Sequence, residues 1–172
     1  MPRLKITPSE IQKYLMLLEK TPERIERCVA TLDSPQLTLA PGPRIWSALE
    51  ILAHLRGCED IWSHSIYTML TQEQPILPLI DERSWTKVMG YTQLDFHLSF
   101  QTFRLRRAEL VTVLQSLPET AWTRSAIIEG RSHTVFSQVR RMGLHEQEHC
   151  NQIEALFLPK AQSFEKDGSK ER

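Results

Sequence analysis

Two histidines near the C-terminal end of the sequence, His145 and His149, lie four residues apart in a segment with helical periodicity. Residues at this spacing share one face of an α-helix, so two imidazoles placed there can reach the same metal ion. The shared face is also apolar, because Met142 and Ile153 continue it on either side. A buried imidazole without a polar partner is costly, and a metal ion supplies such a partner. The pair therefore predicts a metal site.

A third histidine, His54, lies on another apolar helical strip, in line with Ile51 and Cys58. Three neutral imidazoles leave coordination positions open for water or substrate, whereas closed structural zinc sites use four ligands and are rich in cysteine. We therefore expect His54, His145 and His149 to hold one divalent ion, for which zinc, nickel, iron and copper are all suitable. The other histidines show no partnering pattern and are expected at surface or capping positions: His64, His97 and His133.

The segment His145-Glu146-Gln147-Glu148-His149 also matches the HExxH motif of zinc proteases, in which the glutamate acts as general base. Such proteases take a third ligand from downstream, but only a short polar tail with Glu165 and Glu171 follows the motif. No strand-rich portion precedes the helix. A protease is therefore disfavoured, and the glutamate of the motif is expected on the helix surface.

Apolar residues at helical spacing and residues that favour helix ends predict four helical regions. Thr7-Pro8-Ser9-Glu10 and Ser47-Ala48-Leu49-Glu50 both place a capping residue three positions before a glutamate. Pro22 lies inside the first region, where its missing N–H predicts a kink or a restart of the helix. The expected helical regions are residues 8–32, 47–72, 92–118 and 134–157.

The segments between these regions are rich in proline, and we expect loops at residues 34–44 and from Pro75 to Gly90. Thr92 is the expected cap of the third helix. Residues 121–131 are ambiguous, since Ala126-Ile127-Ile128 could form a short extended piece. Four long helices without a run of alternating strands predict an all-α fold, a four-helix up-down bundle whose exact connectivity stays open.

The composition fits one folded domain, since the chain has 172 residues of which 41% are hydrophobic. We expect a bundle domain over residues 1–160 and a polar tail over residues 161–172, which is expected to be disordered. The three cysteines are widely spaced without a CxxC pair, which predicts buried free thiols rather than disulfides or a thiolate zinc site: Cys28, Cys58 and Cys150.

The charges balance, with 21 Lys plus Arg against 21 Asp plus Glu, so nucleic acids and anionic membranes are not favoured as partners. No stretch approaches the roughly 18 apolar residues that a membrane span needs. The N-terminal residues MPRLKITPSE lack the apolar core of a signal peptide. We therefore expect a cytoplasmic protein with a small-molecule substrate.

Two segments, Trp46–Leu55 with the first histidine and His145–Ile153 with the histidine pair, resemble the DinB-like superfamily, also met as YfiT-like metal-dependent enzymes. The resemblance implies a four-helix bundle with His54, His145 and His149 as metal ligands, and a homodimer. Family members often carry an acidic residue two positions after the His-Leu pair, where this sequence has Gly57. Two nearby acidic residues, Glu59 and Asp60, could support the metal site, although a solvated position on the helix surface is the favoured interpretation.

Known members of this family include S-transferases that use bacillithiol, mycothiol or glutathione, and a mycothiol-dependent maleylpyruvate isomerase. The resemblance thus implies a thiol-dependent transferase in which the metal ion deprotonates a thiol cosubstrate. Metal-dependent hydrolysis is the alternative, and a non-catalytic, dimerising stress-response module is the third hypothesis. The sequence assigns no catalytic or cofactor-binding residue, although four arginines could meet the carboxylate of a thiol: Arg44, Arg56, Arg140 and Arg141.

Overall fold

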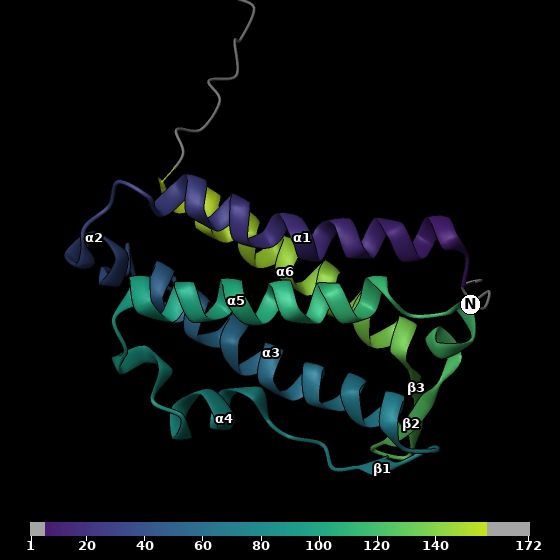
Figure 1. Ribbon diagram of the computed structural model, residues 1–172. Coiled ribbons are helices and arrows are strands. Elements are labelled where there is room, and N and C mark those ends of the chain that lie inside the picture. Colours follow the sequence, from purple (N-terminus) through teal and green to yellow (C-terminus); the bar gives the residue numbers. More distant parts are fainter. Residues whose placement is uncertain (1–5, 158–172) are drawn as a thin grey trace, which may run out of the picture.

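Four long helices pack side by side in the computed structural model, which describes residues 6–157 (Figure 1). They are α1 (Pro8–Val29), α3 (Ala48–Thr71), α5 (Phe96–Gln115) and α6 (Val135–Phe157). This confirms the expected all-α four-helix bundle. The expected tail, residues 161–172, lies outside the described residues. Within residues 6–157, no helix combines the length and the apolar character that crossing a membrane requires.

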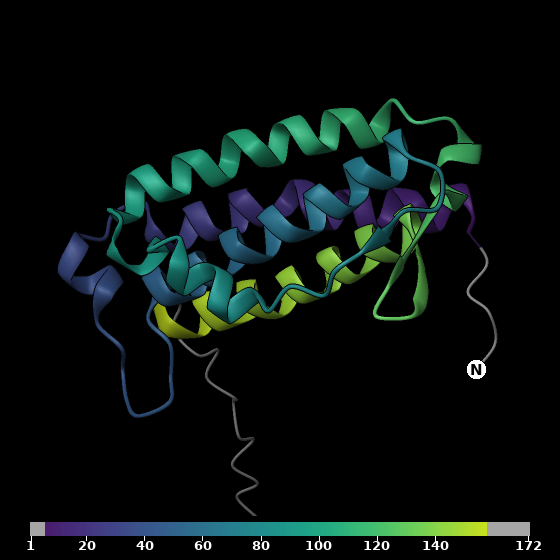
Figure 2. The ribbon, with the colours of Figure 1, turned by 90° about the horizontal axis from the view of Figure 1, so that it is seen from below.

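The long helices are arranged so that α5 and α6 each pack against both α1 and α3. Figures 1 and 2 show that α1 and α6 run in one direction, while α3 and α5 run in the other. The direction therefore alternates between α1 and α3 and between α5 and α6, but α3 and α5 are parallel, so the expected up-down order does not hold at this connection. The long connection between α3 and α5 returns the chain to the end of the bundle where α3 began, which settles the connectivity that the sequence left open.

Helix α1 passes through Pro22 as one helix, so of the two expected alternatives, a kink or a restart, the restart does not occur. A proline leaves the carbonyl four residues earlier without its helical donor. Here that carbonyl, of Leu18, accepts a hydrogen bond from Arg107 Nη1 of α5 at 3.4 Å. A side chain from another helix thus replaces the missing backbone donor, which the sequence of α1 alone does not reveal.

Both expected loops contain short helices. In the first loop, Asp33 caps α2 (Ser34–Thr38) through a capping box with Gln36. In the second, Asp81 accepts hydrogen bonds from two backbone N–H groups at the start of α4 (Glu82–Val88), and the 3₁₀ helix η1 (Tyr91–Gln93) follows. The expected cap at Thr92 is wrong, because Asp95 Oδ1 accepts from Leu98 N at 3.0 Å and starts α5.

A small sheet closes one end of the bundle. Its strands are β1 (Ile76–Leu77), β2 (Ser125–Ile128) and β3 (Arg131–Thr134), with β2 between the other two. Strand β1 pairs in parallel with β2, and β2 pairs antiparallel with β3. The 3₁₀ helix η2 (Glu119–Thr123) precedes the hairpin. For the ambiguous residues 121–131, the structure has the extended alternative at residues 126–128, as part of the first strand of this hairpin.

The apolar core has two parts along the bundle. One part lies around Trp62 and Met69 toward the sheet, and the other around Leu52 and Phe103 toward α2. The three cysteines are buried and free, as expected. His54 comes just before Leu55 and Cys58, which belong to different parts of the core. His54 therefore lies near the middle of the bundle, where the two apolar parts meet.

Candidate metal centre

The three histidines singled out by the sequence come together between α3 and α6. The Nε2 atoms of His54 and His149 each lie 3.1 Å from Nε2 of His145. Nitrogen ligands held about 2.0–2.1 Å from a tetrahedral ion lie roughly 3.3 Å from one another. Both separations are therefore close to the spacing of two nitrogens that share one metal ion.

The protonation state of the cluster also suits metal binding, which requires neutral imidazoles. Burial, with repulsion from His149, lowers the pKa of His54 to about 4. The same two causes lower the pKa of His145 to about 3, and burial lowers that of His149. At neutral pH the three rings are therefore uncharged, and their lone pairs meet at one place without a counter-charge. Nδ1 of His145 is also buried without a hydrogen-bond partner among residues 6–157.

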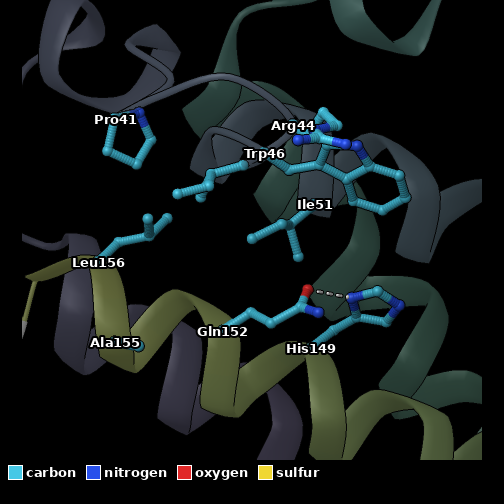
Figure 3. Close-up of a pocket in the computed structure, with 9 residues that line it drawn as sticks. Pro41, Arg44, Trp46, Ile51, His149, Gln152, Ala155 and Leu156 are labelled. Carbon is cyan, nitrogen blue, oxygen red and sulfur yellow. Dashed lines mark hydrogen bonds between the residues drawn. The ribbon is translucent and has the colours of Figure 1, made fainter.

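The orientation of His149 is set by Gln152, three residues further along α6. Its side-chain oxygen Oε1 lies 2.8 Å from Nδ1 of His149 (Figure 3). Because a carbonyl oxygen only accepts, this contact places the imidazole proton on Nδ1 and leaves Nε2 free as a ligand. Gln152 is part of the site that sequence reasoning did not single out, although its i+3 spacing from His149 was a usable signal.

A thiol completes the group of possible donors. Cys58 Sγ lies 3.6 Å from Nε2 and 3.9 Å from Nδ1 of His54. The donor atoms of His54, Cys58 and His145 all lie within 4.8 Å of one another. However, the sulfur is almost equidistant from both nitrogens of one ring, so it lies beside that ring. Burial also raises the pKa of the Cys58 thiol, which favours the neutral form. Cys58 and His149 are thus the two candidates for a third ligand beside His54 and His145.

Two tryptophans border the cluster. The Trp46 ring is nearly parallel to His149, with centroids 6.0 Å apart, and meets His54 edge-on at 5.2 Å. Trp62 packs edge-on against His145 at 4.9 Å. Large apolar rings of this kind keep water away from the imidazoles, which strengthens any electrostatic interaction inside the site.

A buried charge cluster lies behind the histidines. Arg107 of α5 donates to Glu146 from both terminal nitrogens, and its Nη2 also donates to Oε1 of Glu59 at 3.1 Å. The three side chains are 2% exposed or less. The expected surface positions of Glu59 and Glu146 are therefore wrong. Since Arg107 occupies the Glu146 carboxylate, the glutamate of the HExxH pattern is a structural ion-pair partner and not a general base.

A cavity of about 620 Å³ opens beside the cluster, with His149 and Gln152 in its wall (Figure 3). Its other lining is mostly apolar, and Trp46, Ile51 and Leu156 supply much of it. Arg44, held at a positive φ of 65°, is the one charged residue in this lining. A largely apolar cavity with a few polar groups at one end is typical of small-molecule sites.

The model of the DinB superfamily matches residues 17–153 of the sequence. The chain belongs to the DinB superfamily. It is 21% identical over 154 residues, 88% of each protein, to a Bacillus licheniformis protein named as a candidate metal-dependent hydrolase. Its fold matches that of Bacillus subtilis YfiT with a TM-score of 0.79 at 19% identity, over 91% and 90% of the two chains. YfiT is described as a candidate metal-dependent hydrolase with an unusual four-helix bundle topology.

Gly57, at the position where DinB proteins often carry an acidic residue, lies against α4. A Cβ atom there would lie 2.2 Å from Thr86 Oγ1 and 3.3 Å from the carbonyl oxygen of Glu82. The nearby Asp60, expected at the surface, instead accepts hydrogen bonds from Trp85 Nε1 at 3.0 Å and from the Tyr91 hydroxyl at 2.5 Å. In this DinB protein the two residues thus hold α4 and η1 against α3.

The four arginines that could meet a carboxylate have different surroundings. Arg56 is buried, where it donates to Ser99 Oγ at 2.9 Å and lies 4.1 Å from the centre of the Tyr91 ring. Arg140 donates to the hydroxyl of Tyr14. Arg141 pairs with Glu82 at 3.2 Å. Of the four, Arg44 alone lines the cavity beside the histidines.

Proposed function

We propose that this protein is a metal-dependent enzyme in which His54, His145 and His149 hold one divalent ion. The observation that carries the proposal is the convergence of three neutral Nε2 atoms, two of them 3.1 Å from the third. Zinc, nickel and iron all suit such ligands. When bound, the ion supplies the Lewis acidity that activates a nucleophile at neutral pH.

The residues around the histidines would position the substrate. Trp46 and Ile51 offer an apolar surface for its body in the 620 Å³ cavity. His149 lies in the wall of that cavity, so a substrate held there meets the open side of the cluster. Arg107 and Glu146 fix the α6 segment that carries the histidine pair, because their ion pair joins α5 to α6.

Hydrolysis is the reaction we propose first, with water as the nucleophile. It is supported by the two relatives above, both named as candidate metal-dependent hydrolases. Transfer of the substrate to a thiol is the second candidate, because the cavity has room for a cosubstrate next to His149. Both reactions would use the same histidines, so the nucleophile distinguishes them.

The test compares turnover of a panel of esters, amides and alkylating electrophiles with and without added glutathione, bacillithiol or mycothiol. Wild type and His145→Ala are run in parallel on metal-loaded protein. Turnover without thiol that His145→Ala abolishes supports a hydrolase, and turnover that requires a thiol supports a transferase. If neither protein turns over any substrate and removal of the metal unfolds the wild type, the ion is structural and the protein is a non-catalytic module.

A further inference from the structure

A second cavity, of about 270 Å³, lies between α3 and α4 and shares Trp46 with the first cavity. His54 lies in its wall, as His149 lies in the wall of the first cavity. Trp46 lines both cavities and contacts both histidines through its ring. The proposed metal site can therefore be reached from two sides that differ in chemistry.

The second cavity is positively charged. Arg83 and Lys87, one turn apart on α4, both line it, and neither forms an ion pair among the described residues 6–157. Like charges four residues apart on a helix repel each other, so the pair has a small cost in the absence of an anion. Hydroxyl and amide groups complete the polar wall: Thr86, Thr92 and Gln93.

The nearby carboxylates offset these two cations only in part, and Asp81, which interacts with Arg83 through space, is used to cap α4. Glu50 also lines the cavity, but its Oε2 accepts from the Ser47 backbone N–H at 2.8 Å and from the Ser47 hydroxyl at 3.0 Å, where it caps α3. Glu82, next to Arg83 in the sequence, pairs with Arg141 at 3.2 Å. The lining therefore holds two cations against one carboxylate, and neither cation forms an ion pair among the described residues.

We propose that this second cavity binds the carboxylate of the substrate, held by Arg83 and Lys87, while the reacting end of the same molecule lies at the histidines. A guanidinium matches the two oxygens of a carboxylate, and an ammonium adds a point charge. Together with the apolar first cavity, this defines the substrate class as a carboxylic acid with an apolar part. The inference rests on the proposed metal site, because the ion fixes the reacting end.

The experiment uses thiols as probes, since a thiol binds a metal ion directly and its other end then reports on the cavity. Cobalt-substituted protein is titrated with mercaptoacetate, 3-mercaptopropionate and the neutral 2-mercaptoethanol, and dissociation constants are measured from the cobalt absorption spectrum. Wild type is compared with Arg83→Gln, Lys87→Gln and the double variant. Arg131→Gln, at an exposed arginine of β3 away from both cavities, is the matched control.

At least one mercapto acid should bind wild type more tightly than 2-mercaptoethanol. Each substitution on α4 should reduce this advantage by up to about fivefold, because the cations are exposed, and salt should weaken it further. Affinity for 2-mercaptoethanol and the Arg131→Gln values should not change. The carboxylate site is wrong if cobalt binds but neither mercapto acid binds more tightly than 2-mercaptoethanol does. It is also wrong if the α4 variants bind the mercapto acids as tightly as wild type does. If cobalt does not bind, the metal site and this inference are both wrong.

Discussion

At the residue scale, the side-chain amide of Gln152 determines which ring nitrogen of His149 is free to bind a metal ion. Its oxygen Oε1 lies 2.8 Å from Nδ1 of His149 and accepts a hydrogen bond from it. Loss of such a partner typically weakens metal binding by about 10–100-fold. Gln152→Ala should therefore lower metal affinity by this factor, measured by competition with a chromophoric chelator, whereas Glu148→Ala, at an exposed neighbour, should not. Equal affinities in the two variants would contradict the role of Gln152.

The sequence was sufficient to find the histidines but not the residues that hold them. His145 and His149 follow the four-residue spacing of a helix face, and His54 follows the apolar pattern of α3, so both signals are local. Arg107 gives no local signal, because an arginine within a helix is expected at the surface. Its burial depends on carboxylates from two other helices and on the carbonyl that Pro22 leaves free.

At the element scale, the close contact between α3 and α4 depends on the absence of a side chain at Gly57. An alanine Cβ would lie 2.2 Å from Thr86 Oγ1, and overpacking of this kind costs about 1–3 kcal/mol. We expect Gly57→Ala to lower the free energy of unfolding by about this amount in urea titrations. The double variant Gly57→Ala/Thr86→Ala, which lacks the obstructing oxygen, should recover part of the lost unfolding free energy. If it recovers none, the strain does not come from this contact.

The ion-pair cluster that joins α3, α5 and α6 should make stability depend on pH. Burial raises the pKa of Glu59 from 4.5 to about 7, although Arg107 opposes the shift. The folded state therefore binds the Glu59 proton more tightly than the unfolded state does. The protonated carboxyl adds its full contribution to the free energy of unfolding below pH 4.5, and this contribution is lost as pH rises through about 7.

Wild type should thus lose stability as pH rises from about 4.5 to about 7, and Glu59 should cause no further loss above that range. Glu59→Gln, which keeps the shape without the acid, should show a smaller loss over the same range in urea unfolding. Glu26→Gln, at an exposed carboxylate of α1 that pairs with Arg104, serves as the control and should retain the wild-type slope. A Glu59→Gln slope equal to wild type would show that Glu59 is ionised throughout.

The short elements show where sequence patterns are too weak. Helix α4 has seven residues and lies between proline-rich segments, so apolar periodicity has little room to show itself. Its place depends on tertiary contacts, namely the hydrogen bond from Trp85 to Asp60 and the contact at Gly57. The long helices were found because their patterns extend over 20–24 residues, although the first ends at Val29 instead of residue 32.

At the scale of the whole molecule, α3 and α5 run in the same direction because the segment with β1, α4 and η1 crosses the length of the bundle between them (Figure 2). That crossing places α4 beside His54 and so forms the second cavity. The homodimer implied by the family resemblance stays a prediction. Sedimentation equilibrium of the purified protein should give twice the chain mass of 20.0 kDa, and a mass of one chain would contradict it.

The central claim is that three histidines from α3 and α6 bind one metal ion. The most direct test is the metal content of protein purified without a chelating tag, measured by mass spectrometry of the elements. Wild type and Cys58→Ala should each contain about one equivalent of a divalent metal, as expected for one three-histidine site. His54→Ala and His149→Ala should lose most of it, while His97→Ala, at an exposed histidine of α5, should keep it. Full metal content in the His54 and His149 variants would contradict the claim.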